Sequence, residues 1–153
     1  MLRDQIIETM KNAMRAKDVI PLATLRLIQA AMKDRDIAAR SDGNIDGISD
    51  DEILSMLQSM IKQRRDSIDM YENGGRPELA EREAQEIAVI ESFLPEQMDA
   101  DAVNSAVDEI IGELGASSMK DMGRVMATLK ERYAGSMDFG KASGVVKAKI
   151  CGG

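Results

Sequence analysis

Few residues in this chain have side chains able to carry out acid-base or nucleophilic chemistry, and histidine is missing altogether. Because imidazole is the commonest general base, its absence excludes Ser-His and Cys-His catalytic arrangements. Carboxylate pairs remain, such as Glu83 with Glu86 and Asp108 with Glu109, but acids at these spacings occur on most exposed helices. No glycine-rich turn follows a strand-like segment, so no phosphate-cradling nucleotide loop is expected. We therefore predict no catalytic residue and no cofactor.

The polar segment 41–48 carries side chains that resemble the ligands of a calcium loop. Positions 1, 3, 5 and 6 of such a loop are matched by Asp42, Asn44, Asp46 and Gly47. Position 12 is Ile53 instead of the required glutamate, which breaks the match. A hydrogen-bonded turn rich in Asp, Asn and Gly accounts for the same residues, so no metal site is predicted.

Basic residues are the remaining candidates, because Lys and Arg are the usual partners of nucleic-acid phosphates. Lys62, Arg64 and Arg65 fall within about one helical turn of each other. The same side chains could instead pair with nearby acids such as Asp66 and Asp69 and cover apolar surface with their aliphatic stems.

A second group of cations lies near the C-terminus. Residues 96–119 hold six acids and no Lys or Arg, a net charge of −6, whereas residues 120–153 hold seven cations against three acids, a net charge of +4. The seven cations are Lys120, Arg124, Lys130, Arg132, Lys141, Lys147 and Lys149. The whole chain has a net charge of −7, which argues against indiscriminate nucleic-acid binding. These seven are therefore the candidate phosphate contacts, although ordinary solvated helix faces carry similar charges.

The elements that position these residues are predicted to be helices only. Apolar residues recur three or four apart nearly throughout, and no window alternates as a half-buried strand does. Hydrophobic residues make up 44% of the chain but aromatic residues only 3%, so aliphatic side chains and the 12 Met must fill the core. The single cysteine, Cys151, cannot form an internal disulfide. With neither a signal-peptide pattern nor a run of ~20 apolar residues, a cytoplasmic protein is expected.

Seven helices are predicted from the periodicity and its breaks. They cover roughly residues 2–17, 19–40, 50–71, 77–92, 100–114, 119–129 and 139–150. Ser49 with Glu52 three residues later is the signature of a capping box. Asp18 is the predicted N-cap of the second helix, and either Asp99 or Asp101 that of the fifth.

Pro95 marks a predicted division of the chain, because it ends the fourth helix and coincides with the start of the acidic stretch. The predicted fold class is all-α, with an N-terminal four-helix bundle over 1–95 and a smaller three-helix C-terminal subdomain over 96–153.

Four short segments, in order along the chain, carry a resemblance to a known family. They are Leu25-Arg26-Leu27, Lys62-Gln63-Arg64-Arg65-Asp66-Ser67-Ile68, Phe93-Leu94-Pro95-Glu96-Gln97 and Gly115-Ala116-Ser117-Ser118-Met119-Lys120-Asp121-Met122-Gly123. Together they resemble the YqeY-like family of bacterial proteins over essentially the whole chain. That family is similar to the C-terminal tail of GatB, the subunit of the glutamine-dependent aminoacyl-tRNA amidotransferase that delivers misacylated tRNA.

This resemblance implies a helical bundle followed by a smaller helical subdomain, and binding instead of chemistry. The tail of GatB holds the tRNA while catalysis takes place elsewhere, although family labels often extend the parent's carbon-nitrogen ligase activity, with glutamine as amido-N-donor, to free-standing relatives. Family members usually carry a Gly-Arg-Ala-Asp-like turn before the last helix. Here that turn reads Gly135-Ser136-Met137-Asp138, so one cation is missing.

Three functions follow from these observations. The leading hypothesis is a non-catalytic accessory module that binds tRNA or a tRNA-handling complex through the C-terminal cations, helped by those near residue 64. The turn from Gly115 to Gly123 would then either offer backbone donors to an anion or only separate two helices. The alternative is a helical adaptor that binds a protein partner without RNA. A catalytic amidotransferase component is disfavoured, because histidine, Ser-Lys clustering and nucleotide motifs are all absent.

Overall fold

The chain is all-α in the computed structural model, which describes residues 1–151. The elements are α1 (Leu2–Ala16), α2 (Val19–Ser41), α3 (Asp50–Asn73), α4 (Pro77–Glu91), α5 (Ala100–Leu114), the short 3-10 helix η1 (Met119–Asp121), α6 (Met122–Tyr133) and α7 (Phe139–Cys151). The described residues contain no strand, which confirms the predicted class. None of the helices within 1–151 is long and apolar enough to cross a membrane.

Local sequence signals determine several helix ends. The Ser49 hydroxyl accepts a hydrogen bond from the backbone N–H of Glu52 at 3.2 Å, and the Glu52 carboxylate accepts one from the backbone N–H of Ser49 at 3.4 Å. This is the predicted capping box. At the start of α5 the Asp99 carboxylate accepts from the N–H of Ala102 at 2.8 Å, so Asp99 is the cap. Gly115 ends α5 in a left-handed conformation with φ of 62°.

Asp18 is not the side-chain cap that its position suggested. It precedes α2, but its carboxylate accepts no hydrogen bond at the helix start. The turn is closed from the α1 side, where Lys17 adopts a left-handed conformation with φ of 57° and the N–H of Asp18 donates to the carbonyl of Ala13 at 3.1 Å. Asp18 is thus the N-cap residue of α2 by position, as predicted, and its carbonyl accepts from the N–H of Leu22 at 3.0 Å, but its side chain makes no capping hydrogen bond.

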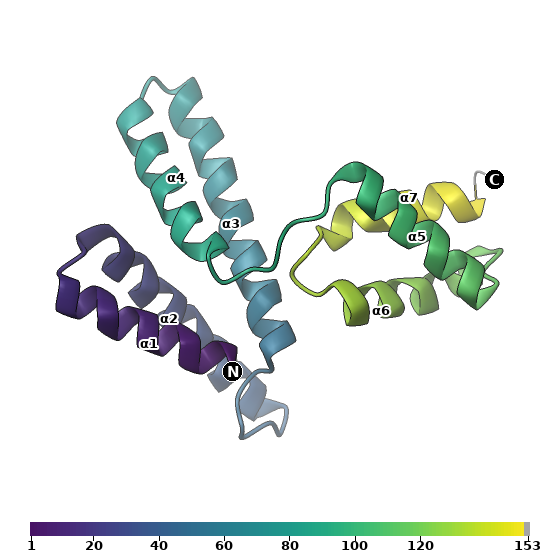
Figure 1. Ribbon diagram of the computed structural model, residues 1–153, viewed down its shortest axis with the longest axis horizontal. Coiled ribbons are helices and arrows are strands. Elements are labelled where there is room, and N and C mark those ends of the chain that lie inside the picture. Colours follow the sequence, from purple (N-terminus) through teal and green to yellow (C-terminus); the bar gives the residue numbers. More distant parts are fainter. Residues whose placement is uncertain (152–153) are drawn as a thin grey trace. The chain divides into compact units, whose positions relative to one another are not determined.

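The first compact unit is Met1–Leu94. α1 lies along α2 and α3 lies along α4, and α2 also packs against α4 (Figure 1). One apolar core joins the four helices, and its most deeply buried members are Ile6, Leu25, Ile28, Met32, Ile53, Met56, Leu57 and Ile90. The outer face of α2 and part of the middle of α3 are left to solvent, and both carry exposed cations.

The second compact unit is Pro95–Gly153, described here as far as Cys151. Each of its helices, α5, α6 and α7, contacts the other two, and η1 contacts both α6 and α7. Their shared core contains Ala106, Val107, Ile110, Val125, Leu129, Met137, Ala142 and Val146. All seven predicted C-terminal cations therefore belong to one small helical unit.

Gln97 closes the segment before α5 onto the turn between α6 and α7. Its Nε2 donates to the carbonyl of Gly135 at 2.7 Å and to that of Pro95 at 2.9 Å, while the N–H of Met98 donates to the carbonyl of Ser136 at 2.9 Å. The bonds to Gly135 and Ser136 each connect residues 38 apart in sequence. The start of the second unit is thus held by polar contacts as well as by its apolar core.

Replacing Gln97 with alanine should lower the free energy of unfolding of the second unit by about 1 kcal/mol, because two carbonyls lose their donor. Gln97→Glu should cost more, since a carboxylate would then face two carbonyl oxygens. Urea unfolding followed by the NMR signals of Tyr133, the tyrosine of this unit, measures both. The exposed neighbour Glu96 provides the control, because Glu96→Ala should change little. Equal stability of all variants would show that the Gln97 bonds contribute nothing.

Candidate nucleic-acid interface

Arg64, the middle cation of the predicted cluster on α3, is a structural residue of the first unit. Its Nε lies 3.0 Å from Oε2 of Glu86 and 4.0 Å from Oε2 of Glu83, both on α4. The Arg64 and Glu86 side chains are each only 12% exposed. Its Nη1 also donates to the carbonyl of Met60 at 3.2 Å. With its donors directed inward, Arg64 is removed from the phosphate contacts predicted for it.

Its two neighbours remain at the surface. Arg65 Nη2 lies 3.5 Å from Oε1 of Glu91, and both side chains are well exposed, so this ion pair is weak and easily exchanged. Lys62 is exposed and has no side-chain partner within residues 1–151. The α3 cluster therefore offers two cations to a ligand instead of three.

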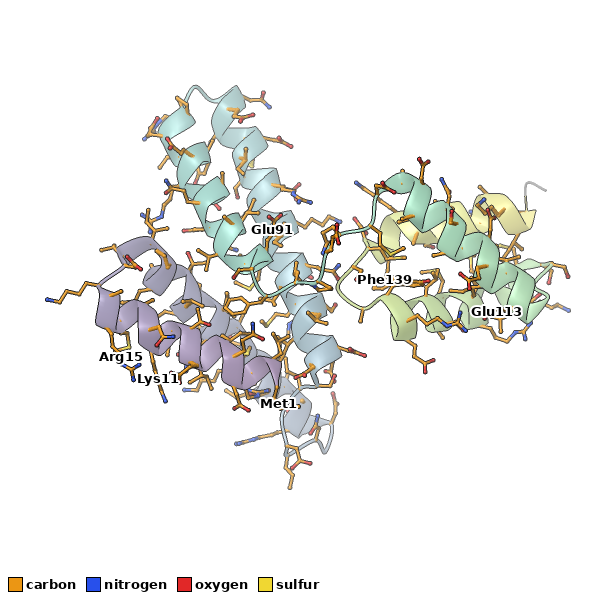
Figure 2. The ribbon with its side chains drawn as sticks, viewed as in Figure 1. Met1, Lys11, Arg15, Glu91, Glu113 and Phe139 are labelled. Carbon is orange, nitrogen blue, oxygen red and sulfur yellow. The ribbon has the colours of Figure 1, made fainter. Side chains whose placement is uncertain are left out.

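In the second unit, acids neutralise three of the seven candidate cations. The closest N–O distance is 2.5 Å for Arg124 with Asp121, 2.7 Å for Arg132 with Glu113 and 2.7 Å for Lys149 with Asp108. The Glu113 and Asp108 partners lie on α5, in the acidic stretch just upstream, and Figure 2 marks Glu113 there. The unit holds seven cations and nine acids over residues 95–153, a net charge of −2.

The pKa values of the acids reflect these pairs. The hydrogen bond from Arg132 holds the pKa of Glu113 below its usual value. The pKa of Asp121 is lowered first by the backbone N–H of Ser117 and then by Arg124. Both carboxylates thus stay ionised in the fold and compete with any phosphate for the same guanidinium groups.

The turn before η1 is not an open anion site. The Asp121 carboxylate accepts hydrogen bonds from the backbone N–H groups of Ser117 at 3.0 Å and Ser118 at 3.4 Å. Backbone donors that were considered for an external anion are therefore used by a side chain of the chain itself. Of the two interpretations of the Gly115–Gly123 segment, the structure supports a turn that separates two helices.

Four lysines of the second unit keep their charge free of any ion pair within the described residues: Lys120, Lys130, Lys141 and Lys147. Lys120 belongs to η1, Lys130 to the last turn of α6, and the other two to α7. Lys141 and Lys147 are six residues apart, so they leave α7 roughly 120° from each other. Lys141 and Lys147 consequently do not share one face of α7.

The turn before α7 has a structural role despite its missing cation. Oδ1 of Asp138 accepts from the N–H of Gly140 at 2.9 Å and from the N–H of Lys141 at 3.3 Å, which makes it the predicted opening residue of the last helix. Met137, only 2% exposed, anchors the turn in the core. Ser136 stands where the resemblance leads one to expect an arginine, and its carbonyl accepts a hydrogen bond from the N–H of Met98.

The remaining candidates for chemistry also have structural partners. Asn44 accepts from the N–H of Asp46 and donates to the carbonyl of Gly47, as expected of a polar turn. Of the carboxylate pairs, Glu83 and Glu86 both face Arg64. Burial, and then repulsion from Glu86, raise the pKa of Glu83 above its usual value. The shift is accounted for by burial beside a second carboxylate, and Arg64 opposes it.

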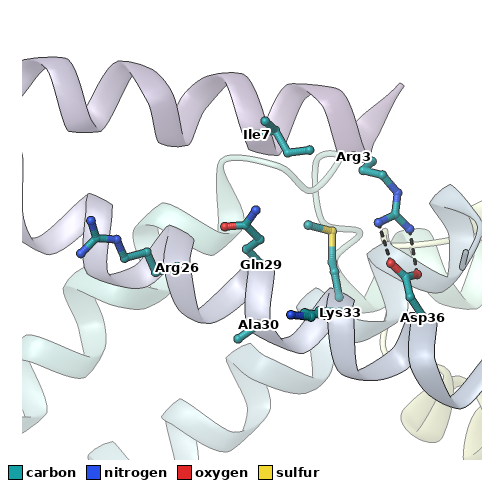
Figure 3. A pocket seen from close by; sticks show the side chains of 8 residues that line it. Arg3, Ile7, Arg26, Gln29, Ala30, Lys33 and Asp36 are labelled. Carbon is teal, nitrogen blue, oxygen red and sulfur yellow. Dashed lines mark hydrogen bonds and ion pairs between the residues drawn. The ribbon is translucent and has the colours of Figure 1, made fainter.

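Sequence reasoning missed a groove of about 470 Å³ between α1 and α2. Its walls include Arg26, Gln29 and Lys33 on α2 and Ile7 on α1 (Figure 3). Two signals could have indicated it. Residues 2–41 hold eight cations against five acids, a net charge of +3, and positions 26, 29 and 33 fall on one helix face. Lys11 and Arg15, which are two of these eight cations, extend from α1 into solvent (Figure 2).

Comparison with known proteins identifies relatives over nearly the whole chain. The family described as Yqey-like protein matches residues 3–150. A protein of Vanderwaltozyma polyspora named "Altered inheritance of mitochondria protein 41, mitochondrial" is 29% identical over 149 residues, covering 92% of this chain and 78% of the relative. The protein of the same name in Pyrenophora tritici-repentis is 30% identical over 132 residues, covering 83% and 70%.

A third relative carries no functional name. It is an uncharacterized protein of Schizosaccharomyces pombe, 29% identical over 96 residues, which covers 63% of this chain and 71% of the relative. The names of the first two relatives place those proteins in mitochondria.

Proposed function

Because the chain belongs to the YqeY-like family, we propose that it is a non-catalytic accessory module that binds tRNA through its second unit. The observation that carries the proposal is the set of four lysines without an acid partner, Lys120, Lys130, Lys141 and Lys147. Free ammonium groups release counterions when they meet phosphates, which is the main source of affinity in such complexes.

The ion pairs within the second unit limit how strongly it would bind tRNA. Arg124, Arg132 and Lys149 each have a carboxylate to exchange before they can hold a phosphate, and the unit as a whole is acidic. Binding should therefore be weak, local and strongly salt-dependent. It suits a module that positions RNA for a partner better than one that captures RNA alone.

The likeness to the GatB tail supports the same assignment. We propose that residues 96–153 are the GatB-tail-like subdomain and that residues 1–95 form a separate four-helix bundle. A carbon-nitrogen ligase label for this family would then describe a complex that the module joins. Among the chain's own carboxylates and amides, Asp99 caps α5, Gln97 bonds the carbonyl of Gly135 and Glu86 pairs with Arg64.

Lys130→Gln with Lys147→Gln should weaken tRNA binding roughly tenfold in low salt and make the slope of log affinity against log salt shallower by about 2. Lys11→Gln with Lys17→Gln is the matched control, because it removes the same charge from exposed positions of the first unit. Filter binding with unmodified tRNA between low and physiological salt measures both. An equal loss of tRNA affinity in both double variants would mean that the binding is non-specific attraction to positive charge. Affinity that does not change with salt would contradict the proposal.

A helical adaptor is the second candidate, favoured by exposed apolar side chains on the first unit. Val19 is 74%, Ile45 78% and Met70 73% exposed. Apolar groups this accessible suit a contact with a protein partner. Cross-linking in cells separates the two functions, since complexes that survive RNase treatment unchanged favour the adaptor.

The cellular compartment is likewise a proposal. We place this protein in the cytoplasm, whereas the relatives' names assign those proteins to mitochondria. Cell fractionation with a compartment marker distinguishes the two locations.

A further inference from the structure

The groove between α1 and α2 combines free positive charge with an apolar floor. On α2 its wall is formed by Arg26, Gln29, Ala30 and Lys33. Gln29 and Ala30 each lie three or four residues from both Arg26 and Lys33, so the row follows one helix face. Figure 3 shows Ile7 of α1 across from this row. The volume of about 470 Å³ lies in the range of sites for small molecules.

The cations of this groove are available to a ligand. The side chains of Arg26, Gln29 and Lys33 are exposed and have neither a hydrogen bond nor an ion pair with any residue in 1–151. Three cations and one acid line the groove, a net charge of +2. In this respect the groove differs from the second unit, where upstream acids neutralise arginines and a lysine.

One end of the groove is built by a fixed ion pair. Arg3 Nη1 and Nη2 donate to the two carboxylate oxygens of Asp36 at 2.8 and 2.9 Å. Because Asp36 is fully engaged in this way, the only acid of the groove does not compete for Arg26 or Lys33. The pair forms a rigid wall that joins α1 to α2 beside the open charges (Figure 3).

The apolar floor of the groove favours an anion that also carries an apolar or aromatic group. Met32 is 2% exposed and supplies the base of the groove, while Ile7 and the small side chain of Ala30 leave apolar surface open above it. The Gln29 amide can both donate and accept a hydrogen bond. Arg26 and Lys33 are separated by about 10 Å along the helix, so their flexible side chains can converge on one anionic group.

We propose that this groove binds a small organic phosphate, with the phosphate held by Arg26 and Lys33 and an apolar or aromatic body resting on Ile7, Ala30 and Met32. The inference concerns the first unit alone and does not depend on tRNA binding by the second. A longer nucleic acid lying across the same cations is the competing outcome of the test.

Isothermal titration of the full chain with adenosine 5′-monophosphate, adenosine and inorganic phosphate tests the proposal. The monophosphate should bind saturably at one site, and adenosine and inorganic phosphate should each bind at least tenfold more weakly, since each lacks one half of the ligand. Arg26→Gln and Lys33→Gln should each weaken binding roughly tenfold. Arg35→Gln, which removes an exposed cation of α2 outside the groove, is the matched control and should leave affinity unchanged.

A steric variant tests the apolar half of the site without changing charge. Ala30→Trp should fill the groove and abolish binding, whereas Ala38→Trp, at an exposed position of α2 outside the groove, should not. Circular dichroism of both variants verifies that they fold. The proposal is overturned by an absence of saturable monophosphate binding at millimolar concentration, by equal effects of Arg26→Gln and Arg35→Gln, or by binding of oligonucleotides without mononucleotides.

Discussion

Replacing Arg64 with methionine is expected to lower the free energy of unfolding of the first unit by about 3 kcal/mol at neutral pH. Methionine keeps much of the aliphatic stem but removes the charge, which leaves Glu83 and Glu86 facing each other in a poorly hydrated space between α3 and α4. Glu86 is 12% exposed and Glu83 21%, so water can compensate them only in part. Arg82, whose Nε lies 3.5 Å from Oε1 of Glu86, is the cation that remains beside them. Urea unfolding followed by the NMR signals of Tyr71, the tyrosine of this unit, measures the loss.

The effect should depend on pH in a direction that the pKa of Glu83 determines. Burial, then repulsion from Glu86, raise this pKa above its ordinary value of 4.5, while Arg64 lowers it. A carboxyl whose pKa is higher folded than unfolded binds more protons in the fold, so its ionisation removes stability as pH rises. Without Arg64 the pKa should rise further. The Arg64→Met penalty should therefore be largest near pH 7 and shrink as pH falls toward 4.5.

Two controls separate the uncompensated carboxylates from simple loss of a cation. Lys62→Met removes a cation from the same helix at an exposed position without an acid partner, and should change stability by less than about 0.5 kcal/mol. Adding Glu86→Gln to Arg64→Met should recover part of the loss, because one of the two carboxylates becomes neutral. If the double variant is as unstable as the sum of the single ones, Arg64 acts through packing and the electrostatic account is wrong.

Features encoded within a few residues could be predicted from the sequence. The capping box of Ser49 and Glu52 and the helix end at Gly115 depend only on neighbours along the chain, and both are present. Asp18 occupies the predicted N-cap position of α2 but makes no side-chain capping bond, and a left-handed Lys17 closes the same turn from the α1 side. Local signals compete with each other, and the sequence alone does not show which one determines the backbone.

The candidate interface was harder to predict, because an ion pair depends on which helices meet. Lys149 is 41 residues from its partner Asp108, and Arg132 is 19 residues from Glu113. A count of charge along the chain places these acids and bases in separate stretches and does not show which of them pair. Packing of α5 against α6 and α7 brings the two stretches together, so only part of the predicted positive surface survives.

Asp36 should be the other position in the first unit where loss of one charge is costly, with a penalty of about 2 kcal/mol for Asp36→Ala. Its carboxylate accepts two hydrogen bonds from Arg3 and a third from the backbone N–H of Ile48 at 2.9 Å, so it joins α1, α2 and the loop before α3. Gly47 passes so close, with φ of 93°, that a Cβ there would lie 3.0 Å from Oδ1 of Asp36. Asp36→Asn should cost less than Asp36→Ala, since the amide oxygen still accepts from Ile48.

The pH dependence at Asp36 should run opposite to that at Arg64. The hydrogen bond from Arg3 is the main cause that lowers the pKa of Asp36 below its ordinary value of 3.8. The ionised carboxylate therefore stabilises the fold at all pH values above 3.8, and this contribution is lost as pH falls below that value. The difference in free energy of unfolding between the native protein and Asp36→Ala, measured by urea unfolding, should stay constant from pH 7 to 5 and narrow only below pH 4.

Asp34→Ala, which removes an exposed acid of the same helix, is the control and should leave the free energy of unfolding nearly unchanged at every pH. A gap at Asp36 that persists undiminished at pH 3 would mean that the side chain stabilises the loop by packing, with its charge playing no part.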